Sequence, residues 1–377
     1  MDTDVLVIGA GPAGAAAGIA AARAGVSVVV LDRARFPRDK TCGDAISNRG
    51  VELYRQLGAL DAILAGPHAR VTTARAILPS GATISRDYPE SGLIVPRQVL
   101  DDALKDALCQ SAAVVREGVS VKAVRASEHA CEVDTSAGQL RARVAIAADG
   151  PGSVAWPALG HRAPKAKALA VARTAYLKHV DPSGADETSE HYFERFLPAG
   201  YAWSFPAVAG VSNVGVYQRA DTYGQGSVHL KALLQTFLDA HPERFSRAEQ
   251  VGPARTWPLP IARLRLPPSG AGLLCAGDAA CLVDPFTGEG IWHALASGML
   301  AGRHAAGAVD RGGLTLAAAL RYRVELTRCV AAPAAARRLL QFGMDRIVGS
   351  GADKLRMTQT LLRLGYRGGL LEVAKRV

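Results

Sequence analysis

The chain has 377 residues, of which 49% are hydrophobic and 21% are charged, a balance that excludes a disordered protein. The formal net charge is +10, and residues 311–377 carry 13 Lys and Arg against 4 Asp and Glu. Such a basic end suits an anionic membrane or an acidic partner. No nucleic-acid-binding motif accompanies the charge, so we expect no nucleic-acid partner.

The six cysteines show no CxxC spacing, so we expect neither a disulfide framework nor a metal site. The sequence opens almost directly into an apolar strand pattern, which argues against a signal peptide. Arg23 and Gly25 interrupt the apolar stretch of residues 13–31, and no uncharged run reaches membrane-spanning length. We therefore expect a cytoplasmic protein that at most touches a membrane from outside.

Residues 4–8, 13–24 and 26–31 predict a strand, a helix and a second strand, which is a βαβ unit with parallel strands. Gly9-x-Gly11-x-x-Gly14 lies between the first strand and the helix. The first glycine permits the tight turn, the second lets the backbone approach a pyrophosphate, and the third lets helix and strand pack closely.

An acid ends the second strand of this unit. Asp32 lies 18 residues after Gly14, where a carboxylate can accept hydrogen bonds from a ribose hydroxyl. Strand, glycine-rich turn, helix and terminal acid agree with one another, so the sequence predicts a dinucleotide site.

The remaining elements predict two interleaved domains and a helical end. Alternating patterns predict strands in 70–95 and an antiparallel sheet over 165–262, and 113–149 looks like a β-meander. The fold class is therefore α/β, or α+β overall, with a Rossmann-type domain and an inserted antiparallel-sheet substrate domain. The predicted ranges are 1–69, 97–164 and 263–310 for the first domain, 70–96 and 165–262 for the second, and 311–377 for the helical region.

A second cofactor signature follows late in the chain. Gly277 and Asp278 end a predicted buried strand, and Asp284–Ile291 precede a helix. Glycines in this segment allow the backbone to lie close to a flat ring, and the helix N-terminus directs positive charge at it. The pattern favours FAD over a nicotinamide cofactor alone.

These motifs resemble the glutathione-reductase-type FAD fold in its hydroxylase-like branch. The resemblance also rests on Ala148-Asp149-Gly150 and on Arg97 at a predicted helix start. The cofactor-binding residues that pattern and resemblance predict are Gly9, Gly11, Ala13, Gly14, Asp32, Arg33, Cys42, Gly43, Arg97, Asp149, Gly277, Asp278, Pro285, Gly288, Glu289, Gly290 and Ile291.

Three further segments resemble motifs of the geranylgeranyl reductases. They are K-x-C-G at 40–43, Y-x-W-x-F-P at 201–206 and P-x-x-G-E-G-I at 285–291. The resemblance implies reduction of C=C bonds in an isoprenoid, a lipid or a polyene natural product. It predicts catalytic roles for Cys42, Tyr201, Trp203 and Phe205, with NAD(P)H or another reductant as the source of electrons.

Several points stay open at the level of sequence. Cys42, Tyr201, Glu289 or a water molecule could donate the proton, and Lys40 could lower the pKa of the Cys42 thiol. The alternative functions are an FAD monooxygenase or halogenase and a non-catalytic FAD-binding protein. Tyr201 and Phe205 depart from the W-x-W-x-I-P segment of halogenases, which favours a reductase.

The basic C-terminal region suggests that the protein takes up a hydrophobic substrate from a membrane surface or from a carrier protein. Arginines and lysines interleave with Leu and Ile in a pattern that suits an amphipathic helix on an anionic membrane or a carrier protein. These residues are Arg337, Arg338, Arg346, Lys354, Arg356, Arg363, Arg367, Lys375 and Arg376.

Overall fold

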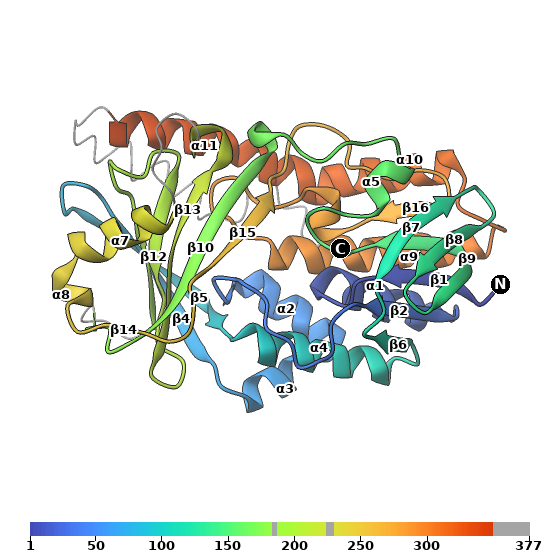
Figure 1. Ribbon diagram of the computed structural model, residues 1–377, viewed down its shortest axis with the longest axis horizontal. Coiled ribbons are helices and arrows are strands. Elements are labelled where there is room, and N and C mark those ends of the chain that lie inside the picture. The colour runs from blue at the N-terminus through green and yellow to red at the C-terminus, as the bar shows by residue number, and fades with distance from the viewer. Residues whose placement is uncertain (183–186, 224–229, 350–377) are drawn as a thin grey trace.

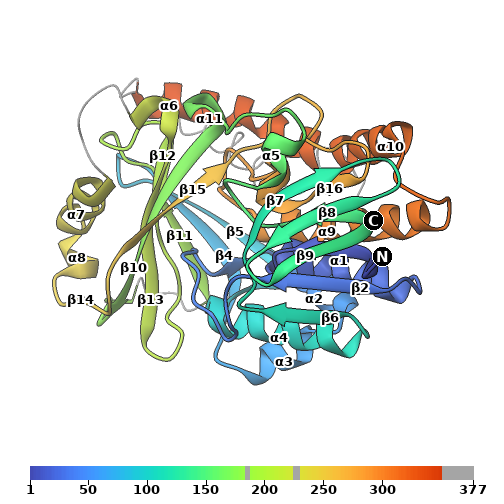
Figure 2. The same ribbon diagram turned by 45° about the vertical axis from the view of Figure 1, so that its right-hand side comes forward.

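Within the described residues, which are 1–182, 187–223 and 230–349, the computed structural model contains a seven-stranded and a nine-stranded β-sheet (Figure 1). The seven-stranded sheet and its helices form one half of the molecule, and the nine-stranded sheet forms most of the other half (Figures 1 and 2).

The seven-stranded sheet is built on five parallel strands, because β6, β2, β1, β9 and β16 pair in that order with parallel neighbours. β1 and β2 are buried almost throughout, as their continuous apolar sequences require of central parallel strands. The strands are β1 (Thr3–Ile8), β2 (Val28–Asp32), β6 (Val114–Glu117), β9 (Gly138–Ala147) and β16 (Leu273–Cys275).

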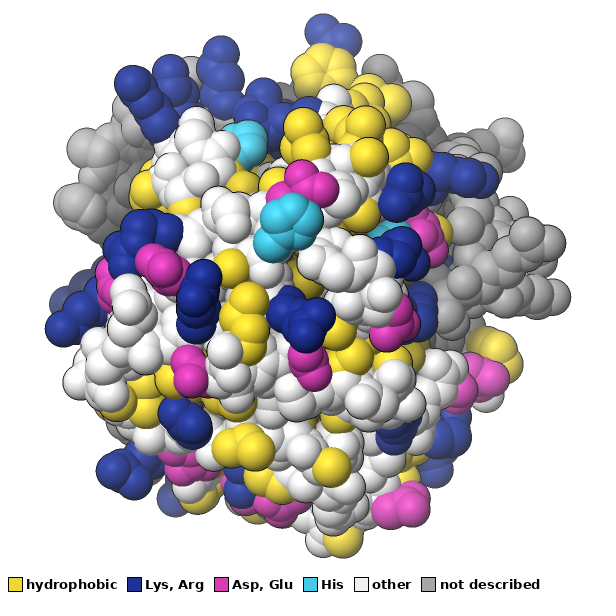
Figure 3. Space-filling view, turned by 90° about the vertical axis from the view of Figure 1, so that its right-hand side faces the viewer, with side chains coloured by type: hydrophobic (Ala, Val, Ile, Leu, Met, Phe, Trp, Pro, Cys, Tyr) yellow, Lys and Arg dark blue, Asp and Glu magenta, His cyan; other side chains and the backbone are white. Residues whose placement is uncertain are grey.

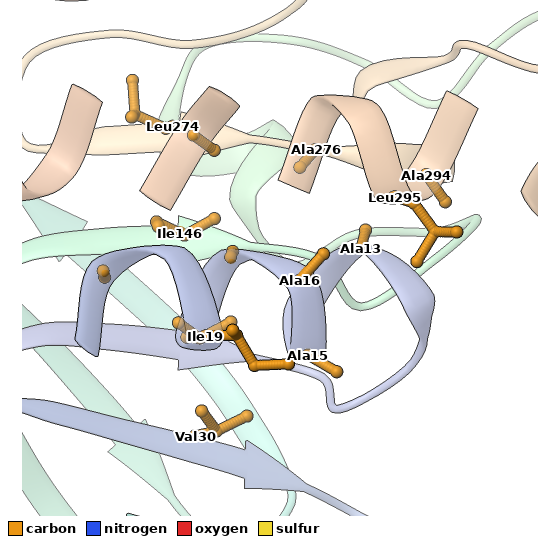
Figure 4. Close-up of a cluster of buried hydrophobic side chains, with 14 of the residues drawn as sticks. Ala13, Ala15, Ala16, Ile19, Val30, Ile146, Leu274, Ala276, Ala294 and Leu295 are labelled. Atoms are coloured by element: carbon orange, nitrogen blue, oxygen red, sulfur yellow. The ribbon is translucent and has the colours of Figure 1, made fainter. Parts of the chain in front are cut away.

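Helices α1 (Pro12–Arg23) and α9 (Ile291–Val309) pack against each other over this sheet. A Cβ at Gly298 would lie 2.1 Å from the Ala13 carbonyl oxygen, so α9 approaches α1 more closely than any larger residue permits. Figure 4 shows small side chains of both helices packed over strand residues such as Ile146 and Leu274.

One element of the predicted meander belongs elsewhere. β7 (Val121–Ala126), β8 (Cys131–Thr135) and β9 pair antiparallel as expected. β6, which was predicted as part of the same meander, instead pairs in parallel with β2. A short strand carries no sequence signal for its partner, because alternation reports burial of a face and not neighbouring strands.

The nine-stranded sheet has the order β14-β10-β13-β12-β11-β4-β5-β3, with β15 also on β10. Its pairs are antiparallel except that β11 and β4 run parallel, so the sheet is mixed. The strands are β3 (Ala45–Ile46), β4 (Ala69–Ile77), β5 (Thr83–Ile94), β10 (Leu169–Lys178), β11 (Thr188–Tyr192), β12 (Gly200–Ser204), β13 (Val211–Arg219), β14 (Glu249–Gln250) and β15 (Arg255–Pro260).

The helices and strands together confirm the predicted fold class of an α/β FAD-binding fold with a second sheet. Residues 45–46 join the second sheet although their range was assigned to the first domain. The other helical elements are α2 (Asn48–Leu57), α3 (Leu60–Ala65), α4 (Arg97–Gln110), α5 (Ala155–Ala158), η1 (Ala166–Ala168), α6 (Ala220–Tyr223), α7 (Leu230–Ala240), α8 (Pro242–Phe245), η2 (Gly277–Ala280), α10 (Leu316–Leu326), η3 (Thr327–Ala331) and α11 (Ala332–Gly349).

The chain after residue 313 is helical, as predicted, as far as it is described. α10 and α11 are joined through η3, a π-helical turn, and together they run along one edge of the molecule (Figures 1 and 2). None of the helices in the described part of the chain is long and apolar enough to cross a membrane.

Candidate active site

A cavity of about 1520 Å³ lies where the carboxyl ends of the parallel strands meet the nine-stranded sheet. This volume exceeds the roughly 300–1,000 Å³ of a typical small-molecule site, so it has room for a dinucleotide and a second molecule. Segments far apart in sequence wall it, from the turn after β1 to the start of α11. The predicted site residues that line it are Gly9, Gly11, Ala13, Asp32, Arg33, Cys42, Gly43, Arg97, Asp149, Tyr201, Trp203, Phe205, Gly277, Asp278, Gly288, Glu289, Gly290 and Ile291.

Two predicted cofactor residues do not line the cavity. Gly14 lies inside α1, where a Cβ would fall 1.7 Å from the Gly9 carbonyl oxygen, so its role is the close packing that the motif predicts. Pro285 instead accepts a 2.8 Å hydrogen bond from the Tyr217 hydroxyl through its carbonyl oxygen.

The glycine-rich turn leaves open space where a phosphate group would bind. Gly9 has φ +96°, and a Cβ there would lie 2.6 Å from the Ala148 carbonyl oxygen. A Cβ at Gly11 would meet only the flexible Arg38 side chain at 3.3 Å. α1 then begins at Pro12, and its first N–H groups point toward the cavity end of the helix. The turn therefore fits a pyrophosphate.

Asp32 ties this turn together. Its Oδ2 accepts a 2.8 Å hydrogen bond from Ala10 N and its Oδ1 accepts one of 2.8 Å from Ala34 N. Each carboxylate oxygen keeps a second lone pair, so both can still accept from ribose hydroxyls. The arrangement is compatible with the predicted ribose contact.

Arg97 is held rigidly at the start of α4. Its Nε and Nη2 donate to the two oxygens of Asp101 at 2.9 and 2.7 Å, and both side chains are almost fully buried. Arg38 lies 3.0 Å from Asp101 on another side. One carboxylate therefore faces two guanidinium groups, which leaves net positive charge beside the cavity for a phosphate or a flavin.

Asp149 and His293 each present a buried atom that has no partner in the described part of the chain. Asp149 Oδ1 and His293 Nδ1 make no hydrogen bond within the described residues, although both side chains line the cavity. Burial raises the pKa of Asp149 and lowers the pKa of His293. Buried polar atoms normally have partners, so these two atoms fit a cavity that holds a polar cofactor such as FAD. The sequence pattern had left His293 out of the site.

The loop before α9 is organised by Asp284, which the sequence pattern had included only as part of a motif. Asp284 is fully buried, and its Oδ1 accepts from the backbone N–H groups of Phe286 and Thr287 at 2.8 and 3.0 Å. Its Oδ2 accepts from Arg337 of α11 at 2.6 Å. These bonds hold Gly288 and the start of α9 against the cavity, where the first N–H groups of a helix suit a flavin ring.

Three aromatic residues of the predicted Y-x-W-x-F-P segment wall the cavity from the second sheet. Tyr201 and Trp203 alternate along β12 and Phe205 follows its last residue, and the neighbouring rings lie 6.2 and 6.1 Å apart. His191 of β11 lies between Tyr201 and Phe205, with ring centroids 5.5 and 5.6 Å away. Gly215 lies opposite Trp203, and a Cβ there would fall 2.3 Å from the indole ring.

A hydrogen-bonded network joins this aromatic wall to the K-x-C-G segment. Trp203 Nε1 donates to Asn213 Oδ1 at 2.9 Å, and Asn213 Nδ2 donates to the Cys42 carbonyl and to Asp44 Oδ2, both at 2.9 Å. The Tyr176 hydroxyl also donates to Asp44 Oδ2, at 2.7 Å. Two motifs more than 150 residues apart are thereby fixed against each other.

Asp44 and Tyr176 are therefore structural parts of the site that sequence reasoning missed. Burial raises the pKa of Asp44 to about 6, although the bonds from Tyr176 and Asn213 oppose this rise. Its Oδ1 is buried without a partner in the described structure. The sequence shows an acid at position 44, directly after Cys42 and Gly43, but it does not show that this acid is buried.

The expected effect of Lys40 on Cys42 is wrong. Burial raises the pKa of the Cys42 thiol, and the charge that opposes this rise belongs to Arg97. The Lys40 ammonium instead lies over the Trp257 ring, 5.4 Å from its centroid. The thiol is consequently neutral at pH 7, which suits a group that holds a proton.

Two other proposed proton donors are engaged by the protein. The Tyr201 hydroxyl donates to the Thr287 carbonyl oxygen, and burial raises its pKa well above the ordinary tyrosine value. A Glu289 carboxylate oxygen accepts a hydrogen bond from the Ser47 hydroxyl. Of these three side chains, Tyr201 and Glu289 are held in hydrogen bonds by the protein, whereas burial keeps the Cys42 thiol protonated.

The glycine cradle, the paired arginine and the late loop define a flavin-dependent oxidoreductase. The chain belongs to the FAD binding domain family, whose model matches residues 2–306. The protein is thus an FAD-dependent oxidoreductase, as predicted.

Relatives of this chain carry the names of reductases. A menaquinone reductase of Mycobacterium tuberculosis is 32% identical over 309 residues, which cover 79% of this chain and 75% of that protein. A digeranylgeranylglycerophospholipid reductase of Methanopyrus kandleri is 30% identical over 321 residues, covering 82% and 78%.

Solved structures share the fold along nearly the whole chain. A geranylgeranyl bacteriochlorophyll reductase-like protein of Thermoplasma acidophilum has a TM-score of 0.81 at 22% identity, covering 96% of this chain and 95% of that one. A flavin-dependent brominase has a TM-score of 0.79 at 21% identity, covering 96% and 93%. At these identities the likeness establishes the fold alone.

Proposed function

We propose that the protein uses FAD to saturate C=C bonds in the polyprenyl chain of a lipid or a quinone. The observation that carries the proposal is one continuous cavity, which is lined both by the dinucleotide cradle and by Tyr201, Trp203 and Phe205. Such a wall is apolar and suits an isoprenoid chain. The names of the relatives support the same class of substrate.

Bound FAD would supply the chemistry that side chains lack, because its reduced form can deliver a hydride to an alkene carbon. The residues that would hold it are the turn at Gly9 and Gly11, the carboxylates of Asp32 and Asp149, and the start of α9. The aromatic wall would hold the alkene in place and exclude water.

The second alkene carbon needs a proton, and we assign it to the thiol at Cys42 Sγ. Cys42 lines the cavity, and a Cβ on its neighbour Gly43 would lie 3.3 Å from the Phe205 ring. The segment that carries the thiol therefore lies against the aromatic wall, and the raised pKa of the thiol keeps it protonated. Asn213 fixes the backbone of Cys42 and the indole of Trp203 at once, so it positions donor and wall together.

The reductant and the cellular setting complete the proposal. The sequence holds no second Gly-x-Gly-x-x-Gly segment for a separate nicotinamide domain, so we propose that NAD(P)H or another reductant visits transiently. We propose further that the protein works in the cytoplasm and reaches its hydrophobic substrate at a membrane surface. A carrier protein that presents the substrate is the competing arrangement.

The test is anaerobic turnover with two substrates. Holoprotein is reduced with dithionite and mixed with a digeranylgeranyl lipid, which lacks a quinone ring, or with the same lipid fully saturated. We expect oxidised FAD to return only with the unsaturated lipid, with a product heavier by two hydrogens per reduced bond. Reaction only after oxygen enters would instead indicate the monooxygenase or halogenase alternative.

A further inference from the structure

The helical edge formed by α10 and α11 exposes apolar side chains at regular spacing. Leu316, Leu320 and Val324 follow one another at four-residue steps on α10 and are 65%, 45% and 44% exposed. Leu339 and Phe342 on α11 are also exposed. Residues four apart lie on the same helix face, so α10 presents an apolar stripe to solvent.

A neighbouring loop extends this stripe. Leu264 is 79% exposed and Leu266 is exposed as well. Arg323 Nε donates to the Pro267 carbonyl oxygen at 2.9 Å, which anchors the loop beside α10. Figure 3 shows hydrophobic side chains gathered at the top of this end of the molecule, with Lys and Arg beside them. We refer to Leu264, Leu266, Leu316, Leu320 and Val324 as the α10 surface.

The charge around the α10 surface is positive. Arg265, Arg321 and Arg328 are exposed, whereas Glu325, the acid on this helix, pairs with His304 at 2.8 Å. Apolar side chains with arginines beside them match the interface of an anionic bilayer, where leucines enter the acyl boundary and arginines meet the headgroups.

The structure corrects which residues of the C-terminal region face outward. Arg337 pairs with buried Asp284, and Arg338 lies 3.7 Å from Asp221 and donates to the Lys167 carbonyl oxygen. These two arginines therefore fasten α11 to the fold. Lys354 and the later basic residues of the predicted amphipathic helix lie outside the described residues.

We propose that the α10 surface docks on an anionic lipid bilayer. The helical edge that carries it also walls the cavity, because Cys329, Pro333 and Ala334 line the cavity from η3 and α11. Docking would place that wall next to the membrane, where a polyprenyl lipid resides. The role of this contact in reaching a polyprenyl lipid rests on the proposed function, whereas binding to the bilayer does not.

The experiment is flotation of the FAD-loaded full chain with phosphatidylglycerol–phosphatidylcholine vesicles and with phosphatidylcholine vesicles, without substrate. Leu320→Glu is compared with Leu64→Glu, because Leu64 of α3 is a helical leucine of similar exposure, 43% against 45%. We expect Leu320→Glu to lower binding to anionic vesicles about tenfold and Leu64→Glu to leave it unchanged. Arg321→Gln and Arg328→Gln should each weaken binding about fivefold, and only on anionic vesicles.

Equal binding of Leu320→Glu and the wild-type protein would overturn the proposal, as would a wild-type protein that binds neither vesicle. A second explanation is that the α10 surface is a contact between two copies of the chain. Light scattering of both proteins tests it, because the wild-type protein would then be a dimer and Leu320→Glu a monomer. Bound FAD, read from its absorbance, shows that each variant is folded. The assay measures no turnover. Membrane binding can therefore be absent while alkene reduction is observed, and alkene reduction can be absent while membrane binding is observed.

Discussion

Replacing Asp44 by Asn should change how stability depends on pH. In the folded protein burial raises the pKa of Asp44 to about 6, whereas the ordinary pKa of a solvated aspartate is 3.8. The folded state therefore binds more protons than the unfolded state between these values, and its stability falls as pH rises through them. A difference of about two pKa units corresponds to about 3 kcal/mol once the pH is well above 6.

Asn is a close match for the neutral carboxyl. It can accept from Tyr176 and Asn213 as Asp44 Oδ2 does, and it never ionises. Asp44→Asn should therefore gain stability relative to the wild-type protein as pH rises. About 2 kcal/mol of that gain should fall between pH 4.5 and pH 7.5, because both pKa values lie near or within this range.

Urea unfolding of both proteins at saturating FAD, repeated along this pH range, measures the difference between their free energies of unfolding directly. Other titrating groups act equally on both proteins and cancel in the comparison. If the difference between the two free energies of unfolding does not change with pH, Asp44 ionises normally in the folded protein. If Asp44→Asn instead loses stability relative to the wild-type protein as pH rises, the sign of the reasoning is wrong.

Three further changes test the packing and the polar network. Gly298→Ala places a Cβ 2.1 Å from a backbone oxygen of α1, so it should lower the free energy of unfolding by about 3 kcal/mol and cause loss of bound FAD. The control Gly307→Ala, in the same helix, meets only a flexible arginine and should be neutral or stabilising by about 0.5 kcal/mol. Denaturant unfolding of both variants measures the two effects. Asn213→Ala leaves the Trp203 indole N–H without its acceptor and should destabilise by about 2 kcal/mol; no loss by thermal unfolding would contradict the network. Arg97→Lys breaks a buried bidentate pair and should weaken FAD binding at least about tenfold in fluorescence titration, and unchanged affinity would remove Arg97 from the cofactor site.

The parts of the fold that local sequence rules control were predicted well. The turn at Gly9 and the acid at Asp32 are local patterns, and the family resemblance singled out Tyr201, Trp203 and Phe205. The structure places all of these residues on one cavity. The pairing of β6 with β2 and the parallel pair of β11 with β4 were not predicted. Strand pairing depends on distant segments, and a single sequence shows no contact between them.

The same limit explains what was missed in the site. Asp44, Tyr176 and Asn213 come from three separated segments, and only the folded sheet brings their polar groups within 2.9 Å. Arg337 was predicted to face a membrane because the sequence shows charge and spacing but not a buried carboxylate such as Asp284. Polar residues whose partner lies far along the chain are the ones that pattern reasoning misplaces.

The central claim is that this protein passes reducing equivalents from FAD to an alkene without oxygen. The most direct measurement is one anaerobic turnover of dithionite-reduced holoprotein with an excess of digeranylgeranyl lipid, followed by flavin absorbance and product mass. The account predicts that the absorbance of oxidised FAD returns in step with one saturated bond per flavin. Flavin that stays reduced until oxygen is admitted, with the lipid unchanged, would contradict it.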